Sequence, residues 1–210
     1  MYMYGSLFKK IVLLVIVCTN IYASVSTSFG VILVIPKDAV PVYGVYTAFG
    51  SSSSSIDITS TTTSTVETKK RIKNSTLTTG VMLGLENNIY RTSITYDVTN
   101  ASYVDQKRLL FNFDFKIPVE GTLTPVLGLG IGSVNSEYGL NGRYIQNSNG
   151  VISLRLGTDY LLSEQKSLVL LLEVTKTISS SSDNYMEDST FTSYEIVKQS
   201  SYSIRLGYNF

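Results

Sequence analysis

The feature that most constrains this chain is a two-residue alternation of apolar and polar side chains, which dominates from residue 40 onward. It is clearest in the last stretch, where one face carries Tyr202, Ile204, Leu206, Tyr208 and Phe210 and the other carries only small or polar residues. Successive side chains of a β-strand point to opposite faces of a sheet, so each alternating stretch predicts a strand with one apolar face. Because no stretch in this region shows convincing helical periodicity, we expect an all-β fold.

The alternation occurs in eight segments, at residues 42–50, 76–86, 88–98, 108–117, 123–133, 151–160, 167–176 and 202–210. Short connections join some neighbouring segments, at residues 87–88, 118–122 and 161–166. Long polar loops are expected at 51–75, 134–149 and 178–195, and the first of these has so few large apolar residues that we expect it to be mobile. Short turns at one end and long loops at the other are typical of outer-membrane β-barrels.

The charged residues distinguish a membrane barrel from a soluble β-sandwich. Every charge in the middle of a predicted strand falls on the polar face: Glu86, Arg91, Asp97, Asp114, Lys116, Arg155, Asp159, Glu173 and Arg205. Glycines share that face, as a crowded interior requires, whereas the aromatic residues beside the short turns lie on the apolar face, as in an interfacial girdle. We therefore predict an eight-stranded, antiparallel, up-and-down transmembrane β-barrel over residues 40–210. A tyrosine-rich secreted sandwich is the alternative.

The N-terminus has the pattern of an export signal. A short basic stretch ending at Lys10 precedes an apolar run, and Ala23 is a plausible cleavage point, so we predict a signal peptide at 1–23. Residues 24–39 form a segment of unknown role. Cys18 allows a lipoprotein interpretation, but Val17 stands before it where a small residue is expected. Cleavage at Ala23 would leave a mature chain without cysteine, and hence without disulfides.

Three stretches resemble the eight-stranded OmpA/Opa-type outer-membrane barrel family: "TPVLGLGIGSV" (124–134), "VISLRLGTDYLLSEQKSLVLLLE" (151–173) and "YSIRLGYNF" (202–210). The resemblance implies a Gram-negative outer membrane, with its lipid as surroundings. It also implies that the last strand, through Tyr202, Ile204, Leu206, Tyr208 and Phe210, is the signal read by the barrel-insertion machinery.

Neither catalysis nor a cofactor is indicated by the sequence. The enzymes known among outer-membrane barrels imply a catalytic His, and this chain has none. Asp114 and Asp159 form a candidate carboxylate pair; the alternative is that they neutralise Lys116 and Arg91 or Arg155. No metal site is expected, since ligands at suitable spacing are missing. The net charge of +1 and the isolated basic run at 69–73 argue against nucleic-acid binding.

The candidate site is a set of charges facing the lumen. Arg155, Glu173 and Arg205 lie near the middle of three successive strands, so Glu173 is expected to bridge the two arginines. The remaining candidates are Arg91, Asp97, Asp114, Lys116 and Asp159. Such charges form either an ion-paired plug or a gate. We thus expect a non-catalytic barrel with a structural or adhesin-like role through long surface loops that bind a surface ligand. The alternative is a small channel or carrier for ions or small apolar molecules.

Overall fold

The computed structural model describes residues 38–61, 65–102, 104–140, 143–163, 166–179, 181–187 and 190–210. Its strands are β1 (Val40–Thr61), β2 (Thr65–Glu86), β3 (Tyr90–Ala101), β4 (Val104–Lys116), β5 (Leu123–Leu140), β6 (Arg143–Ser163), β7 (Lys166–Thr177), β8 (Ser181–Glu187) and β9 (Thr190–Asn209). None of these residues belongs to a helix long and apolar enough to cross a bilayer.

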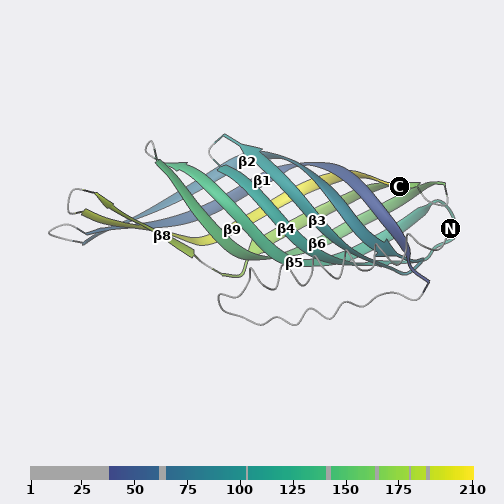
Figure 1. The fold of residues 1–210 in the computed structure, drawn as a ribbon. Coiled ribbons are helices and arrows are strands. Elements are labelled where there is room, and N and C mark those ends of the chain that lie inside the picture. Colours follow the sequence, from purple (N-terminus) through teal and green to yellow (C-terminus); the bar gives the residue numbers. More distant parts are fainter. Residues whose placement is uncertain are drawn as a thin grey trace. The chain divides into compact units, whose positions relative to one another are not determined.

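Eight of the strands close into a ring. Each strand from β1 to β6 pairs antiparallel with the one that follows it, β7 pairs with β9, and β9 returns to β1 (Figure 1). The seam extends to the last residue, because the Phe210 amide donates to the Tyr43 carbonyl at 2.8 Å and the Tyr43 amide donates to the Phe210 carbonyl at 3.0 Å. The short β8 pairs only with the far end of β9 and stays outside the ring. The predicted eight-stranded antiparallel barrel is confirmed.

Towards the short turns, the barrel has an apolar exterior and a polar interior. The exposed side chains of this zone include Val45, Phe49, Leu83, Leu129, Leu156 and Leu172. Aromatic residues gather at the edge of this zone that is nearest the short turns. There the Tyr43 and Phe210 rings lie 6.2 Å apart, and the Tyr90 and Phe115 rings lie 5.6 Å apart. We call this zone the apolar band. It ends, strand by strand, at Phe49, Leu77, Val98, Leu109, Ile131, Ile152, Val174 and Tyr202.

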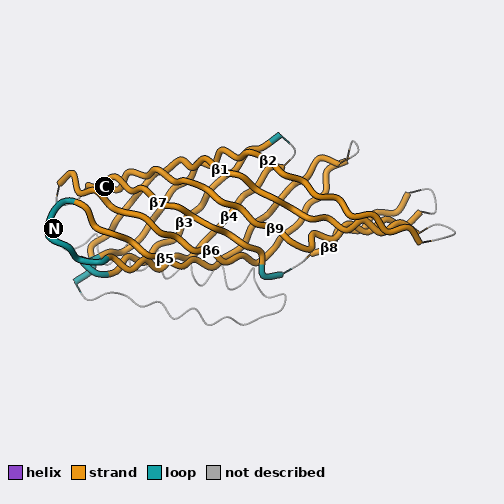
Figure 2. Tube along the Cα trace, turned by 180° about the vertical axis from the view of Figure 1, so that it is seen from behind, coloured by secondary structure: helices purple, strands orange, loops and turns teal. Residues whose placement is uncertain are grey.

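Beyond the apolar band the strands continue, but here their outward face is polar and their inward face is apolar. We call this part the extension; it comprises residues 51–61, 65–75, 104–107, 133–140, 143–150, 181–187 and 190–200 (Figure 2). Its exterior carries serines and charged residues. Its interior holds an apolar core of Ile56, Ile72, Val104, Tyr138, Ile145, Tyr194 and Ile196.

The extension is built from two sheets that face one another. The pairing of β2 with β3 ends at Leu77, and the pairing of β6 with β7 ends at Val151. Strands β2, β1, β9 and β8 therefore form one sheet, and β4, β5 and β6 form the other. The Tyr138 hydroxyl lies 3.0 Å from the Ser54 hydroxyl on the opposite sheet, and burial raises the pKa of Tyr138 above its ordinary value.

The prediction of loops at 51–75, 134–149 and 178–195 is therefore wrong for most of their length. Strands β1 and β2 pair continuously from Val40↔Glu86 to Thr61↔Thr65, so 51–61 and 65–75 are paired strands and not parts of a mobile loop. Composition misled the prediction, because serine can occupy a strand when its neighbours supply the pairing. Isolated residues such as Ile56 and Ile72 supply the buried face. The predicted signal peptide and residues 24–37 lie outside the described residues.

Candidate functional site: a charged lumen

A first ion-pair cluster fills the lumen near the short turns. Arg91 on β3 donates from Nε to Asp114 Oδ2 at 3.0 Å and from Nη1 to Asp159 Oδ2 at 2.8 Å. Arg155 on β6 approaches the other side of the same carboxylate, with Nη2 at 2.7 Å from Asp114 Oδ1. All four side chains are at most 1% exposed. The two aspartates considered as a carboxylate pair are thus each held by arginine.

Two further charges border this cluster. Lys116 places Nζ 3.6 Å from Glu86 Oε2 and 3.9 Å from Asp159 Oδ2. Arg91 Nη1 also lies 3.7 Å from Glu86 Oε2. The Glu86 side chain retains 22% exposure, so this is the edge of the cluster.

A second cluster lies one level further from the short turns. Glu173 on β7 contacts Arg205 Nη2 with Oε2 and Arg108 Nη1 with Oε1, both at 2.5 Å. Arg108 also binds Asp97, with Nη2 2.9 Å from Oδ2. The Tyr46 hydroxyl donates to Asp97 at 2.8 Å, and the Arg205 guanidinium stacks over the Tyr46 ring at 3.9 Å from its centroid. These contacts therefore form a closed ring across the lumen, which runs from Arg205 through Glu173, Arg108, Asp97 and Tyr46 back to Arg205.

The structure places every predicted lumen charge inside the barrel but changes one partnership. Arg155 and Glu173 lie opposite each other on β6 and β7, yet the guanidinium of Arg155 binds Asp114. Arg108 takes its place as the second cation on Glu173. Arg155 and Asp114 flank Gly128 in one register row, and because Gly128 has no side chain the two charged groups can meet above it. Arg108 on β4, by contrast, reaches across the lumen to Glu173 on β7.

Sequence reasoning missed Arg108 and Tyr46. Arg108 stands at the start of the predicted strand 108–117, and it has the same parity as Leu110 and Asn112, which face inward. That parity was the available signal. Tyr46 lies on the inward face of β1, but no local pattern indicates that its hydroxyl serves a buried aspartate.

Across the described residues the lumen charges balance. Five cations face the interior of the apolar band: Arg91, Arg108, Lys116, Arg155 and Arg205. Five anions accompany them: Glu86, Asp97, Asp114, Asp159 and Glu173. Buried charges are tolerated when they are paired and hydrogen-bonded. Equal numbers of each sign satisfy that condition for the lumen as a whole.

Glycines on the inward face make room for these side chains. A Cβ added at Gly128 would meet the Asp114 carboxylate, and one added at Gly80 would meet the Tyr46 ring. The inward glycines are therefore part of the site, because larger residues there would displace the groups that pair.

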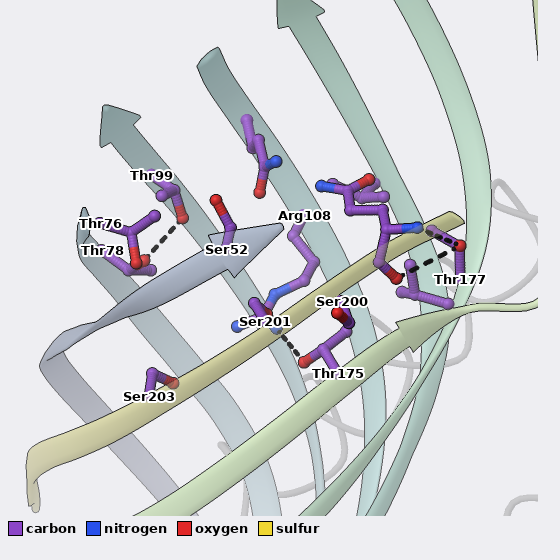
Figure 3. Close-up of a pocket in the computed structure, with 14 residues that line it drawn as sticks. Ser52, Thr76, Thr78, Thr99, Arg108, Thr175, Thr177, Ser200, Ser201 and Ser203 are labelled. Atoms are coloured by element: carbon purple, nitrogen blue, oxygen red, sulfur yellow. Dashed lines mark hydrogen bonds between the residues drawn. The ribbon is translucent and has the colours of Figure 1, made fainter. Parts of the chain in front are cut away.

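Two small cavities lie among the described lumen residues. One cavity, about 30 Å³, lies on the side of the second cluster that faces the extension. It is lined mostly by hydroxyl groups (Figure 3). Beside it the Thr78 and Thr99 hydroxyls lie 2.6 Å apart and Arg108 donates to the Thr175 hydroxyl at 2.8 Å. A second cavity, about 20 Å³, lies next to Arg91, Asp114, Arg155 and Arg205. Volumes of this size hold only about one or two water molecules. At these two places beside the ion pairs, side chains therefore leave room for little more than single waters.

Comparison with solved structures places the fold among outer-membrane barrels. Neisserial surface protein A (NspA) aligns over 82% of this chain and 98% of that chain, at 10% identity and a TM-score of 0.55. The N-terminal β-barrel domain of OprF from Pseudomonas aeruginosa aligns over 76% of this chain and 97% of that chain, at 10% identity and a TM-score of 0.43. The outer-membrane protease OmpT from Escherichia coli aligns over 86% of this chain and 99% of that chain, at 8% identity and a TM-score of 0.39.

The likeness to NspA shows the fold, so the chain has the architecture of the small OmpA/Opa-type outer-membrane barrels that its strands resemble. No protein-family model matches the chain, and no curated protein matches it in sequence.

Proposed function

We propose that this chain is an outer-membrane barrel of a Gram-negative bacterium that catalyses no reaction and whose lumen is closed. It anchors the extension as a rigid surface-interaction element. The observation that carries the proposal is the balanced set of five cations and five anions across the lumen. A membrane location is supported by the apolar band, whose exposed side chains would be unfavourable in water and favourable in lipid.

The packing supports a closed lumen over a channel. An eight-stranded barrel has an interior just wide enough for side chains. Here long charged groups cross it, with Glu173 contacting residues of both β4 and β9. An ion crossing this level would have to separate pairs that are excluded from water.

The extension supports a role in surface interaction. Its core fixes two sheets against each other, so its exterior is presented on a firm scaffold rather than on a mobile loop. Exposed aromatic side chains stand close to the ends of two hairpins, with Tyr144 72% exposed and Phe191 45% exposed. Aromatic residues are frequent anchors in protein interfaces. We propose these hairpin ends as the part that meets a partner at the cell surface.

Single-channel recording on the full protein refolded into planar bilayers tests the closed lumen. Wild type is expected to be silent, and Glu173→Ala is expected to open frequently, because it leaves Arg108 and Arg205 without their shared anion. Asp57→Ala is the control, since Asp57 pairs with Lys69 on the surface of the extension and should leave the recording silent. Steady conductance from wild type would overturn the proposal and favour the channel or carrier.

A further inference from the structure

A group of basic residues lies on the exterior just beyond the apolar band. It consists of Arg71 and Lys73 on β2, Lys176 on β7 and Lys198 on β9, all exposed. The strands that carry them are neighbours in the order β7, β9, β1, β2. We call these four residues the basic patch.

The strand register places the patch in two adjacent rows. In the first row Lys176 pairs with Ser200, Ser200 with Ser53, and Ser53 with Lys73. In the second row Lys198 pairs with Ser55, and Ser55 with Arg71. Neighbouring strands are about 4.8 Å apart, so the basic side chains of a row flank serine-bearing strands within about 15 Å.

The patch is continuous with the apolar band. Lys176 is the first outward residue after Val174, the last apolar residue of β7, and Lys73 is the second after Leu77 on β2. One outward step along a tilted strand rises by about 5 Å, since it spans two residues of about 3.3 Å each at about 40°. Arg71, one step further out, turns towards the band, because its Nε donates to the Ser53 hydroxyl at 3.2 Å.

At the level of the basic patch, the exposed charges of the two rows are all positive. Among the described residues the two rows contain no acid, and none of the three lysines forms an ion pair. The next outward row contains Asp57 and Glu195 together with Lys69. Among the described residues of the turns and chain start at the opposite end of the barrel, the exposed charges are Asp38, Glu120 and Lys166. On the part of the chain that the structure describes, an acid-free cationic surface thus lies at one edge of the lipid-facing band.

We propose that the basic patch binds the phosphate groups of an anionic lipid headgroup in the outer leaflet. The inference rests on the proposed membrane location, because the band fixes the height at which lipid phosphates occur. Headgroups occupy roughly the first 5–8 Å beyond the hydrocarbon on each side of a bilayer. Lysine and arginine reach that layer by extending their side chains along the surface. The serine hydroxyls between them offer further hydrogen bonds to phosphate oxygens.

Calorimetric titration of the full protein, refolded in detergent micelles, with diphosphorylated lipid A tests the assignment. Lipid A with both phosphates removed is the reference probe. The patch variant is Lys73→Gln/Lys176→Gln/Lys198→Gln. The matched control Lys69→Gln/Lys70→Gln/Lys166→Gln removes the same charge from exposed positions outside the patch. A shift in gel migration on boiling reports that each variant is folded.

Wild type and the control are expected to bind the phosphorylated lipid, and the patch variant about a hundredfold more weakly, since three basic groups at an anionic surface each contribute several-fold. The affinity should also fall as salt rises. Equal affinity for the two lipids, or equal losses in both variants, would overturn the proposal. Displacement by millimolar inorganic phosphate would overturn the assignment to lipid. Bilayer conductance is independent of these outcomes, so a failure here is distinguishable from an open lumen.

Discussion

At the scale of single residues, the lumen depends on shared partners rather than on isolated pairs. Glu173 is held between Arg108 and Arg205, and Asp114 between Arg91 and Arg155. Each acid therefore compensates two cations, and its loss leaves one of them, Arg205 or Arg155, without an ion-pair partner among the described residues, while the other keeps a second acid. Removing one partner of a buried pair typically costs more than the pair contributes, because the remaining charge stays buried.

We expect Glu173→Gln to lower the free energy of unfolding by about 3–5 kcal/mol, measured by urea unfolding in detergent. Adding Arg205→Gln should recover part of that loss, so the double variant will be more stable than the sum of the single effects predicts. Asp57→Asn, which alters an exposed pair, should change the stability by less than about 1 kcal/mol. Additive effects in the cycle would contradict the shared-anion arrangement.

At the scale of elements, the long hairpins are stabilised from within the extension. Outside the band lipid no longer favours an apolar exterior, so the strands there are stabilised by their backbone pairing and by apolar groups buried between the two sheets. Tyr138 is fully buried there and reaches the Ser54 hydroxyl. Tyr144, on the next strand, is exposed. The two tyrosines therefore form a matched pair for testing the core.

Tyr138→Ala is expected to destabilise the extension by about 3–5 kcal/mol, as large-to-small changes of buried aromatic residues do. Hydrogen exchange should then quicken in residues 51–61, 65–75 and 133–140, while the amides of β3 inside the apolar band keep their protection. Tyr144→Ala should leave all these rates unchanged. Exchange in 51–75 that is already fast in wild type would show that the hairpin is not folded as described.

At the scale of the whole molecule, the ring closes along nearly the full length of β9 and the seam reaches Phe210. Lipid offers no partner for a free strand edge, so β9 must complete its bonds to β1. Phe210 does so through both of its backbone groups, and its ring lies 6.0 Å from that of Tyr208 and near Tyr43. We propose that the same strand is the signal that the insertion machinery reads.

Phe210→Ala should reduce the fraction of protein that assembles in membranes, measured as the fraction whose gel migration shifts on boiling. The change removes the aromatic contacts at the seam and the final residue of the proposed signal. Val197→Ala, an outward residue of the same strand beyond the band, is the control and should assemble as wild type does. Equal assembly of Phe210→Ala and wild type would remove Phe210 from the signal.

The sequence by itself determined the class of fold, the inward parity of the charges and the positions of the short turns, because these depend on a local period of two. Even Arg108, which the prediction left out, lies on the parity that its neighbours indicate. Only the tertiary structure decided which charges pair, since Arg108 and not Arg155 is the second cation on Glu173, while Arg155 binds Asp114. It also decided that residues 51–61 and 65–75 are strands. Their stability comes from pairing and from a core assembled by distant residues such as Ile56, Tyr138 and Ile196, and neither is visible in a polar stretch read alone.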